Sequence, residues 1–239
     1  MMISIVIPTL NAAAHLPRAL APLVHGVAHG LVKQVIIADG GSTDETLEIA
    51  EAAGCDIVIG EPGRAKQLRA GALASRANWL LLLNADTSLT PGWVSEVERH
   101  MNLPQARKRA AAFRLALDDD SAIAKRIVFW ARLRARVMRL PYGDQGLLIS
   151  RLLYDALGGY PDQPAMEDIE IARRIGRKRL AILNSDAVAS AEKYRREGRM
   201  HALRNLSMMT RYFFGADPAS LVIAARPDQR EAVRASSGV

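Results

Sequence analysis

The residues from Trp79 to Leu83 form an unbroken apolar run that ends in Asn84, Ala85 and Asp86. A short apolar run bounded by polar residues is typical of a strand buried on both faces of a parallel sheet. Open α/β sheets bind ligands at the carboxyl ends of such strands. Alternation along an extended chain would direct Asn84 and Asp86 to the same side. Their oxygen atoms predict a site for a hard cation; the alternative is a polar turn that only caps the next helix.

The chain before this run alternates strand-like and helix-like segments with short connections. Apolar patterns predict strands at 3–8, 35–39, 55–60 and 78–84, and helices around 16–27, from 42 onward and at 64–76. The helix after the second strand is expected to start at Ser42, because Ser42 and Glu45 have the spacing of a capping box. This order predicts an α/β fold, a Rossmann-like, mostly parallel sheet flanked by helices on both faces.

Length and composition limit the class of protein. The chain has 239 residues, 49% hydrophobic and 24% charged, which is the composition of a soluble globular protein. Residues 1–8 lack the basic leader of a signal peptide, and no apolar run approaches the length of a membrane-spanning helix, so we expect a cytoplasmic protein. The one cysteine, Cys55, begins an apolar run and is expected in the core.

Positive charge is concentrated in the second part of the chain. Residues 1–103 carry a net charge of −3, and the remaining residues carry +10. A basic part indicates an anionic partner: nucleic acid, a phospholipid surface or a phosphorylated substrate. A nucleic-acid-binding protein would be expected to show a basic reading helix or stacking aromatic residues on a sheet face. The few aromatic residues here fall mostly on apolar helix faces, so we expect no nucleic-acid partner.

A glycine-rich turn follows the second predicted strand. The first strand ends in Pro8-Thr9-Leu10-Asn11, which provides neither the G-x-G-x-x-G of a dinucleotide fold nor a P-loop. The glycines come instead in Asp39-Gly40-Gly41-Ser42, where they would let the backbone approach a ligand closely. Asp39 at the strand end is expected to accept hydrogen bonds from a base or ribose. The alternative is a tight turn that Asp39 only caps.

The pattern changes after Thr90-Pro91, where a helix is expected to begin and to run to about residue 102. Further patterns predict a strand at 110–117, a solvated acidic turn at 118–120, a helix at 121–140, a loop at 140–146, a strand at 147–150 and a helix at 169–175. A second basic helix is expected at 195–211, and the tail from Asp217 is expected to be loosely ordered.

The predicted helix at 121–140 contains six basic residues and no acidic residue. At the helical repeat, one narrow stripe holds Lys125, Arg132, Arg136 and Arg139, and the opposite side holds Ile123, Ile127, Trp130, Val137 and Met138. Phe129 falls beside the basic stripe. The pattern is typical of an element that meets an anionic membrane surface or an anionic acceptor. The alternative is a solvated basic face over an ordinary core stripe.

Two adjacent carboxylates, Glu167 and Asp168, open a late predicted helix. The helix dipole stabilises carboxylates in a first turn, which is a sufficient structural reason for their position. The functional interpretation is a general base, because a helix N-terminus at a loop edge presents a carboxylate rigidly.

Four motifs occur in order at predicted strand and helix ends: V-I-P-T-L-N, D-G-G-S-T-D, N-A-D and M-E-D. Together they resemble the family 2 glycosyltransferases of GT-A fold, over roughly residues 3–215. The loops G-R-A-K-Q-L-R-A-G and L-P-Y-G-D-Q-G are similar to those of the small bacterial subgroup called selenodomain-associated transferase 2.

The resemblance implies an inverting, metal-dependent transfer of one sugar from a nucleotide-diphosphate sugar to an acceptor hydroxyl. For the donor, it implies that base and ribose meet Pro8, Thr9, Asn11, Asp39 and Gly41, and that nucleotide or phosphate meets Arg64, Lys66, Asn84, Ala85 and Asp86. Asp86 would bind Mg²⁺ or Mn²⁺ at the leaving diphosphate. Asp168 would be the base, with Glu167 as its substitute, and Tyr142, Asp144 and Gln145 would contact the acceptor.

The same resemblance divides the chain into a single domain at 1–215, with a nucleotide-binding half at 1–103 and an acceptor-binding half at 104–215, and a tail at 216–239. The basic segments 121–140 and 195–214 suggest peripheral contact with an anionic membrane and a lipid-linked acceptor.

Two features depart from the wider family. The usual metal motif is Asp-x-Asp, and here Asn84 replaces the first carboxylate, so this position could contact ribose instead of a metal ion. The Q-x-x-R-W motif of processive polysaccharide synthases is absent, which favours transfer of a single residue. The alternatives left open are a sugar-phosphate nucleotidyltransferase and a non-catalytic nucleotide- or nucleic-acid-binding protein.

Overall fold

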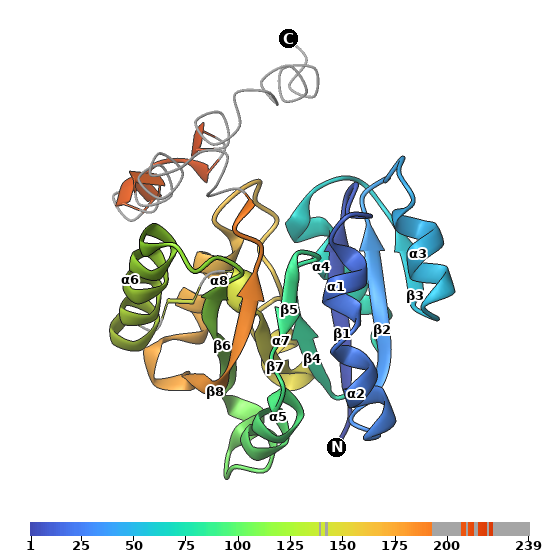
Figure 1. Ribbon diagram of the computed structural model, residues 1–239. Coiled ribbons are helices and arrows are strands. Elements are labelled where there is room, and N and C mark those ends of the chain that lie inside the picture. The colour runs from blue at the N-terminus through green and yellow to red at the C-terminus, as the bar shows by residue number, and fades with distance from the viewer. Residues whose placement is uncertain are drawn as a thin grey trace.

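The computed structural model describes residues 1–138, 140–141, 143–192, 207–208, 210–212, 215–218 and 220–221 (Figure 1). Its strands are β1 (Ile3–Thr9), β2 (Val32–Asp39), β3 (Asp56–Ile59), β4 (Trp79–Leu82), β5 (Thr87–Leu89), β6 (Ala110–Leu117), β7 (Leu147–Ser150) and β8 (Leu180–Ala189). Its α-helices are α1 (Leu16–Leu20), α2 (Leu23–Ala28), α3 (Thr46–Ala52), α4 (Arg64–Ala74), α5 (Trp93–Met101), α6 (Ala122–Met138), α7 (Arg151–Ala156) and α8 (Glu167–Ile175). Short 3₁₀ turns cover Ala106–Lys108, Gly143–Gln145 and Arg177–Arg179.

Within the described residues, eight strands form one sheet in the order β3-β2-β1-β4-β7-β6-β8-β5. The first four strands of this order run parallel to their neighbours. β7 runs antiparallel to both β4 and β6, β8 is parallel to β6, and the edge strand β5 is antiparallel to β8. The predicted α/β architecture is confirmed, and one sheet runs through both predicted halves of the chain.

The sheet curls back on itself beside β4. β5 follows β4 after only the four residues from Leu83 to Asp86, yet it pairs with β8 at the far end of the strand order. A connection of that length spans little more than ~14 Å, so the far edge of the sheet has to return to the end of β4. The N-A-D motif is therefore held where the two ends of the sheet meet, and the backbone N–H of Ser190 donates to the carbonyl of Asp86 at 3.2 Å.

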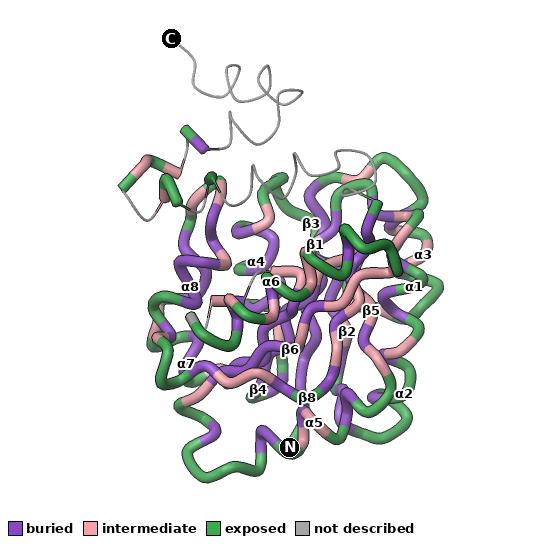
Figure 2. The backbone as a smooth tube through the Cα atoms, turned by 60° about the vertical axis from the view of Figure 1, so that its left-hand side comes forward, coloured by how far each residue is buried: buried purple, intermediate pink, exposed green. Residues whose placement is uncertain are grey.

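β1 is buried along most of its length (Figure 2), and its side chains alternate between two layers of the core. Ile3, Ile5 and Ile7 are fully buried on one face, in a cluster with residues of α1, α2 and α5. Val6 is buried on the other face, in a cluster with residues of α4, α7 and α8. Both faces are covered by helices, which is why the strands read as continuous apolar runs instead of alternating ones.

Two predicted helix starts are wrong. The helix predicted from the Ser42 capping box begins at Thr46, and the Ser42 hydroxyl donates to the Asp39 carboxylate instead of capping a helix. The helix predicted at Pro91 begins at Trp93 after a left-handed Gly92. In each case the polar residue bonds to a neighbouring strand or loop: the backbone N–H of Asp186 in β8 donates to the Thr90 hydroxyl.

Two strands were not predicted and one strand is shorter than expected. β5 has three residues, and β8 carries the polar residues Asn184, Ser185 and Asp186, so neither has the apolar pattern of a core strand. The predicted strand 78–84 ends at Leu82, because the chain turns at Ala85 and Asp86 to reach β5.

The helix predicted at 121–140 is present as α6, but its buried side differs from the prediction. Its inward residues are Ala124, Ala131 and Ala135, and Ala131 packs against Leu115 and Ala189 of the sheet. Trp130, predicted opposite the basic stripe, is 64% exposed, so this side is not an ordinary core stripe. The periodicity located the apolar stripe, but it did not distinguish large apolar residues from the alanines that fit close to a strand.

Several predictions lie outside the described residues. These are the predictions for Arg139, for Tyr142, for most of 195–214, and for all but a few residues of the 216–239 tail. None of the helices in the described part of the chain has both the length and the apolar character needed to cross a membrane.

A tight contact between α4 and β1 gives a test of this packing. A Cβ atom at Gly71 would lie 2.3 Å from Cγ1 of Val6. Gly71→Ala should therefore lower the free energy of unfolding by about 1–3 kcal/mol in urea titrations. At an exposed helix position the same substitution would instead raise the free energy of unfolding by about 1 kcal/mol.

Val6→Ala supplies the matched control, since it removes the atom that the new methyl group would meet. In that background the penalty of Gly71→Ala should shrink, and equal penalties in the two backgrounds would contradict the contact.

Candidate functional site

The loops that follow β1 and β2 interlock at the carboxyl edge of the sheet. Asn11 adopts a left-handed conformation with φ 51°. Its side-chain oxygen accepts from the backbone N–H of Thr43 at 2.9 Å, and its own backbone N–H donates to the Ser42 hydroxyl at 2.8 Å. Thr46 closes the same contact by accepting from the backbone N–H of Ala12. The V-I-P-T-L-N and D-G-G-S-T-D motifs thus form one surface.

Asp39 is the centre of this surface and is fully buried. Its Oδ1 accepts from the backbone N–H groups of Gly41 and Ser42 at 2.8 and 2.7 Å. Its Oδ2 accepts from the hydroxyls of Thr9 and Ser42 at 2.9 and 2.5 Å. Burial alone would raise the pKa of Asp39, but hydrogen bonds from Ser42, Thr9 and Gly41 outweigh it and lower that pKa. The carboxylate therefore holds both loops in shape as an anion.

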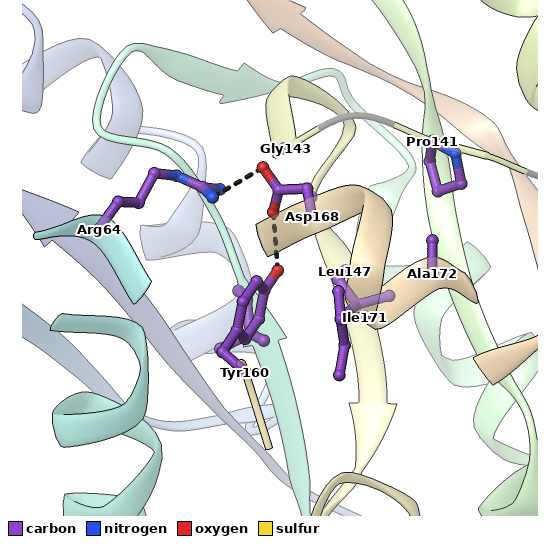
Figure 3. A pocket seen from close by; sticks show the side chains of 10 residues that line it. Arg64, Pro141, Gly143, Leu147, Tyr160, Asp168, Ile171 and Ala172 are labelled. Atoms are coloured by element: carbon purple, nitrogen blue, oxygen red, sulfur yellow. Dashed lines mark hydrogen bonds and ion pairs between the residues drawn. The ribbon is translucent and has the colours of Figure 1, made fainter. Parts of the chain in front are cut away.

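Arg64, the first residue of α4, pairs with Asp168 of α8 (Figure 3) and also bonds Asn84 at the end of β4. Its Nη1 donates to Glu167 Oε1 and to Asp168 Oδ2, each at 2.7 Å. Its Nε and Nη2 donate to the side-chain oxygen of Asn84 at 3.1 and 2.8 Å. Tyr160 completes the group, because its hydroxyl donates to Asp168 Oδ1 at 2.9 Å. One guanidinium thus gathers side chains that are about 20 and about 100 residues away along the chain.

The electrostatics of this group follow from its burial. Burial disfavours the charged guanidinium, but the nearby Asp168 and Glu167 carboxylates outweigh that cost and raise the pKa of Arg64 further above its usual value. Burial and the negative charge of Asp168 raise the pKa of Glu167, and Arg64 opposes this only in part. Burial and Asp168 also raise the pKa of Tyr160. Tyr160 therefore stays a neutral hydrogen-bond donor at neutral pH.

A narrow pocket lies over this ion-paired group. It is lined by Arg64, Leu82, Pro141, Gly143, Gly146, Leu147, Tyr160, Asp168, Ile171 and Ala172. Gly143 lies close to the ion pair: a Cβ atom there would lie 2.4 Å from Asp168 Oδ2 and 2.5 Å from Arg64 Nη2, so a side chain at this position would displace them. The next residue, Asp144, accepts from the side-chain amide of Asn84 at 2.8 Å. The loop 140–146 thus closes one side of the pocket.

Asn84 and Asp86 lie beyond the end of β4, in the connection to β5. β4 ends at Leu82, and a turn follows in which the backbone N–H of Thr87 donates to the carbonyl of Asn84, so strand alternation does not apply. The side-chain oxygen of Asn84 faces the Arg64 guanidinium, a position that a metal ion cannot share with that cation. Asp86 is half-buried and accepts a long 3.4 Å bond from the Thr87 hydroxyl. Metal binding by Asp86 stays a prediction.

The other predicted site residues fall into three groups. Pro8, Gly41 and Ala85 lie on the strand edge, beside Thr9, Asp39 and Asp86 respectively. Lys66 is exposed and pairs with Glu61 at 2.7 Å. Gln145 is fully buried and donates to the carbonyl of Phe113, so contact with an acceptor would require its exposure.

Two contributors were not predicted. Tyr160 contacts Asp168 across a loop, and the only sequence signal was its position after Gly158-Gly159, which does not indicate the contact. Ser190 lies beside Asp86 because β8 pairs with β5, and the polar sequence of β8 gave no sign of that pairing.

Comparison with known proteins gives one family and several related structures. The model of the family described as Glycosyl transferase family 2 matches residues 4–136. An uncharacterised glycosyltransferase of Mycobacterium bovis is 28% identical over 172 residues, which cover 66% of this chain and 75% of that protein.

Two solved structures show the same fold at low identity. TarS of S. aureus, residues 1–349, superposes with a TM-score of 0.63 and 13% identity, covering 94% of this chain and 69% of that one. Glucosyl-3-phosphoglycerate synthase of Mycobacterium tuberculosis, in complex with Mn²⁺, uridine diphosphate and phosphoglyceric acid, has a TM-score of 0.56 and 21% identity, covering 76% of this chain and 67% of that one. The curled α/β sheet described above is thus the GT-A architecture.

The environment of Asp39 gives a test by pH. Asp39→Asn places an amide N–H₂ among groups that already donate, and should lower the free energy of unfolding by about 2–4 kcal/mol at pH 7. Because the folded-state pKa of Asp39 is lowered, its contribution is complete above the ordinary aspartate pKa of about 3.9 and is lost as the pH falls towards the folded value. Urea unfolding at pH 7 and pH 3 measures both effects.

Asp155→Asn is the control, since Asp155 pairs with Arg151 on an exposed helix surface. It should change the free energy of unfolding by less than about 0.5 kcal/mol. A loss for Asp39→Asn that is no larger than this would contradict the proposed environment.

Proposed function

Because the chain belongs to glycosyl transferase family 2, we propose that it transfers one sugar, with inversion at the anomeric carbon, from a nucleotide-diphosphate sugar to an acceptor hydroxyl. The chain is a glycosyltransferase by family. The observation that carries the finer proposal is the Arg64 bridge, which holds the loop at the end of β4 against Glu167 and Asp168. A displacement needs a leaving-group site and a base on opposite sides of one small space, and these elements lie on the two sides of Arg64.

Asp168 is the base in this proposal. Tyr160 and Arg64 each hold one of its oxygens, which fixes the direction of the carboxylate. The pairing with Arg64 also occupies the oxygen Oδ2 of this carboxylate. A donor diphosphate would compete for the guanidinium, and its arrival would free Asp168 to take the proton of the acceptor hydroxyl. Glu167, with its raised pKa, is the substitute for this role.

The interlocked loops at Asn11 and Asp39 would receive the nucleoside. Their backbone is held rigid by the Asp39 carboxylate, so the site needs little ordering when the nucleotide binds. Pro8, Thr9 and Gly41 border the same surface. The side chain of Asn84 accepts from Arg64 and donates to Asp144. In this proposal it would hold the Arg64 guanidinium beside the diphosphate, and it would also contact the ribose.

A divalent cation, Mg²⁺ or Mn²⁺, fits one part of this arrangement. Glucosyl-3-phosphoglycerate synthase and GalNAc-T7 are solved with Mn²⁺ and uridine diphosphate. Nucleotide-bound Mg²⁺ is usually held by one or two carboxylates together with phosphates and water, and Asp86 offers one carboxylate at the strand edge. A bound cation would neutralise charge on the leaving diphosphate.

The acceptor is proposed to be a hydroxyl on a lipid-linked or membrane-borne molecule, approached past the loop 140–146 with Asp144. This rests on the basic second part of the chain. The loops at 63–71 and 140–146 further suggest the selenodomain-associated transferase 2 subgroup.

Replacement of Asp168 tests the assignment of the base. Asp168→Asn should lower kcat for transfer by about 10²–10⁴-fold with a small change in the donor KM, because a positioned general base contributes on that order. Asp162→Asn, an exposed carboxylate in the loop before α8, should leave kcat within about twofold. If Asp168→Asn retained wild-type kcat and Glu167→Gln did not, the role would belong to Glu167.

Binding of nucleotides tests the donor and metal sites without an acceptor. A thermal-shift screen of UDP, GDP and their sugars, each with and without Mn²⁺, should show a Tm increase that depends on the metal ion. Asp86→Ala should abolish the Mn²⁺-dependent part, and Asn84→Ala should keep it while weakening nucleotide binding. Full Mn²⁺ dependence in Asp86→Ala would overturn the metal assignment.

A further inference from the structure

Helix α6 buries its small side chains and exposes its large ones. Ala124, Ala131 and Ala135 face the sheet and are at most 7% exposed. The large apolar residues face outward: Ile123 (43% exposed), Phe129 (60%), Trp130 (64%), Leu133 (39%) and Val137 (55%). A helix that only covered the core would show the reverse distribution, because burial of large apolar side chains stabilises the fold more than burial of alanine. The outer side of α6 is therefore better suited to contact with an apolar partner than to exposure to water.

The exposed apolar residues of α6 form a continuous ridge. Trp130, Leu133 and Val137 have the spacing of one helix face, and Ile123 lies two turns before Trp130 on the same face. The rings of Phe129 and Trp130 pack edge to face, with centroids 5.6 Å apart and an interplanar angle of 78°. We call this set the α6 ridge. A single exposed apolar residue needs no explanation, but a contiguous row of them marks an interaction surface.

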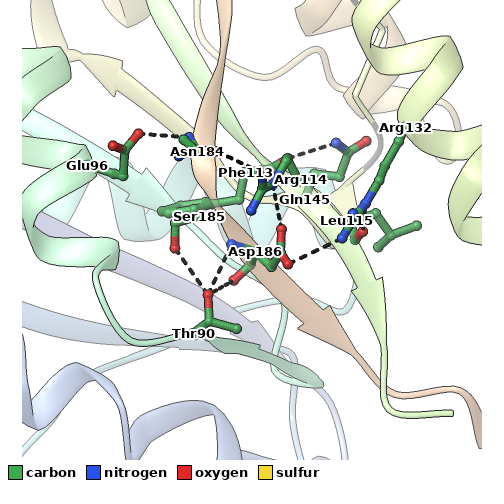
Figure 4. A network of polar contacts seen from close by, with 10 residues as sticks. All are labelled: Thr90, Glu96, Phe113, Arg114, Leu115, Arg132, Gln145, Asn184, Ser185 and Asp186. Carbon is green, nitrogen blue, oxygen red and sulfur yellow. Dashed lines mark hydrogen bonds and ion pairs between the residues drawn. The ribbon is translucent and has the colours of Figure 1, made fainter. Parts of the chain in front are cut away.

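Basic side chains flank the α6 ridge. Lys125, Arg126 and Arg136 are exposed and make no ion pair within the described part of the chain, and α6 contains no acidic residue. Arg132, in contrast, holds the helix to the sheet (Figure 4): its Nη2 lies 3.2 Å from Asp186 Oδ2, and its Nε donates to the carbonyl of Leu115 at 2.7 Å. Arg132 thus holds α6 to the sheet, while Lys125, Arg126 and Arg136 are exposed on the outer side of the helix.

We propose that α6 docks on an anionic lipid bilayer, with Phe129 and Trp130 inserted at the headgroup level and Lys125, Arg126 and Arg136 against the lipid phosphates. Interfacial helices combine such an apolar ridge with flanking basic residues, and the amphipathic indole of Trp130 suits the boundary between water and hydrocarbon. A second copy of the chain would bring the same positive charges to the contact. A nucleic acid would complement the charges but would leave the apolar ridge in water.

Docking through α6 would bring the pocket towards the membrane. The helix leads directly into Pro141 and Gly143, which line the pocket together with Arg64 and Asp168. A lipid-borne hydroxyl would therefore be presented to Asp168 from the bilayer surface. This last step rests on the proposed transfer reaction, whereas the docking itself does not.

Intrinsic fluorescence can report on the docking of the unmodified chain. Of its three tryptophans, Trp79 and Trp93 are 1% exposed, so a change in polarity at the protein surface reports on Trp130. Vesicles of phosphatidylglycerol and phosphatidylcholine should shift the emission to shorter wavelength at low salt, and pure phosphatidylcholine vesicles should shift it much less. Binding should weaken with added salt, because the lipid charge is screened.

Substitutions at exposed positions distinguish vesicle binding through the α6 ridge from nonspecific adsorption of the protein to vesicles. Phe129→Ser with Trp130→Ser should lower vesicle binding in flotation assays by roughly tenfold or more. Lys125→Gln, Arg126→Gln and Arg136→Gln together should lower it by about fivefold per charge. The matched controls are Leu152→Ser, an exposed leucine on α7, and the triple change of the exposed Lys33, Lys108 and Lys178 to Gln, and both should bind as the wild type does.

Four results would overturn the docking. Two concern the lipid: no emission shift at low salt, or vesicle binding by the α6 variants equal to that of the wild type. Two point to another partner: tighter retention of the wild type by duplex DNA than by vesicles, or a wild-type dimer, without vesicles, that dissociates in the Phe129→Ser, Trp130→Ser variant. Nucleotide binding by thermal shift, measured without lipid, should be unchanged in every α6 variant. Failure of the docking would thus leave the transfer reaction standing, and failure of nucleotide binding would leave the docking standing.

Discussion

The bridge from Arg64 to Glu167 and Asp168 is the interaction on which the rest of the site depends. Two carboxylates on adjacent residues, both largely buried, would repel each other and lack solvation without a cation between them. Removing one member of such a buried pair typically costs about 3–5 kcal/mol, since it leaves the other charge uncompensated. The loop at 140–146 and the N-A-D turn both contact that guanidinium: a Cβ atom at Gly143 would displace it or Asp168, and the side-chain oxygen of Asn84 accepts from it.

The backbone puts Arg64 in reach of these partners. It begins α4, which packs on β1 and β2, whereas α8 covers β4 and β7 on the same face of the sheet. The curl of the sheet adds the third component, because β8 returns beside β5 and brings Ser190 to Asp86. Elements from both parts of the chain therefore meet at the end of β4, where the α/β sheet changes from parallel to antiparallel pairing.

Much of the fold could be predicted from those segments whose local sequence pattern agrees with their place in the tertiary structure. The apolar runs of β1, β2 and β4 predicted the parallel part of the sheet, and the motifs at their ends predicted residues that do lie on one edge. Family membership then decides between the transferase and the other classes that composition left open.

The wrong predictions have a common cause. Ser42, Thr90 and Trp130 carry the local sequence signals of a cap, a helix start and an apolar stripe. In the folded chain, a distant bonding partner or the space available decides where each side chain lies. Ser42 bonds Asp39, Thr90 bonds β8, and α6 approaches β6 closely enough to favour its alanines over Trp130.

The sequence by itself determined the elements that local periodicity encodes, the residue types available at the strand ends and the basic character of the second part. It could not determine which side chain bonds Asn84, which carboxylate Tyr160 holds, or which side of α6 faces outward. Those outcomes depend on contacts between residues far apart in the chain, and their energies come from burial and charge pairing that exist only after folding. The tertiary structure therefore decided how the residues after β4 are placed: the side-chain oxygen of Asn84 accepts from Arg64, and Asp86 lies in the turn where the two ends of the sheet meet.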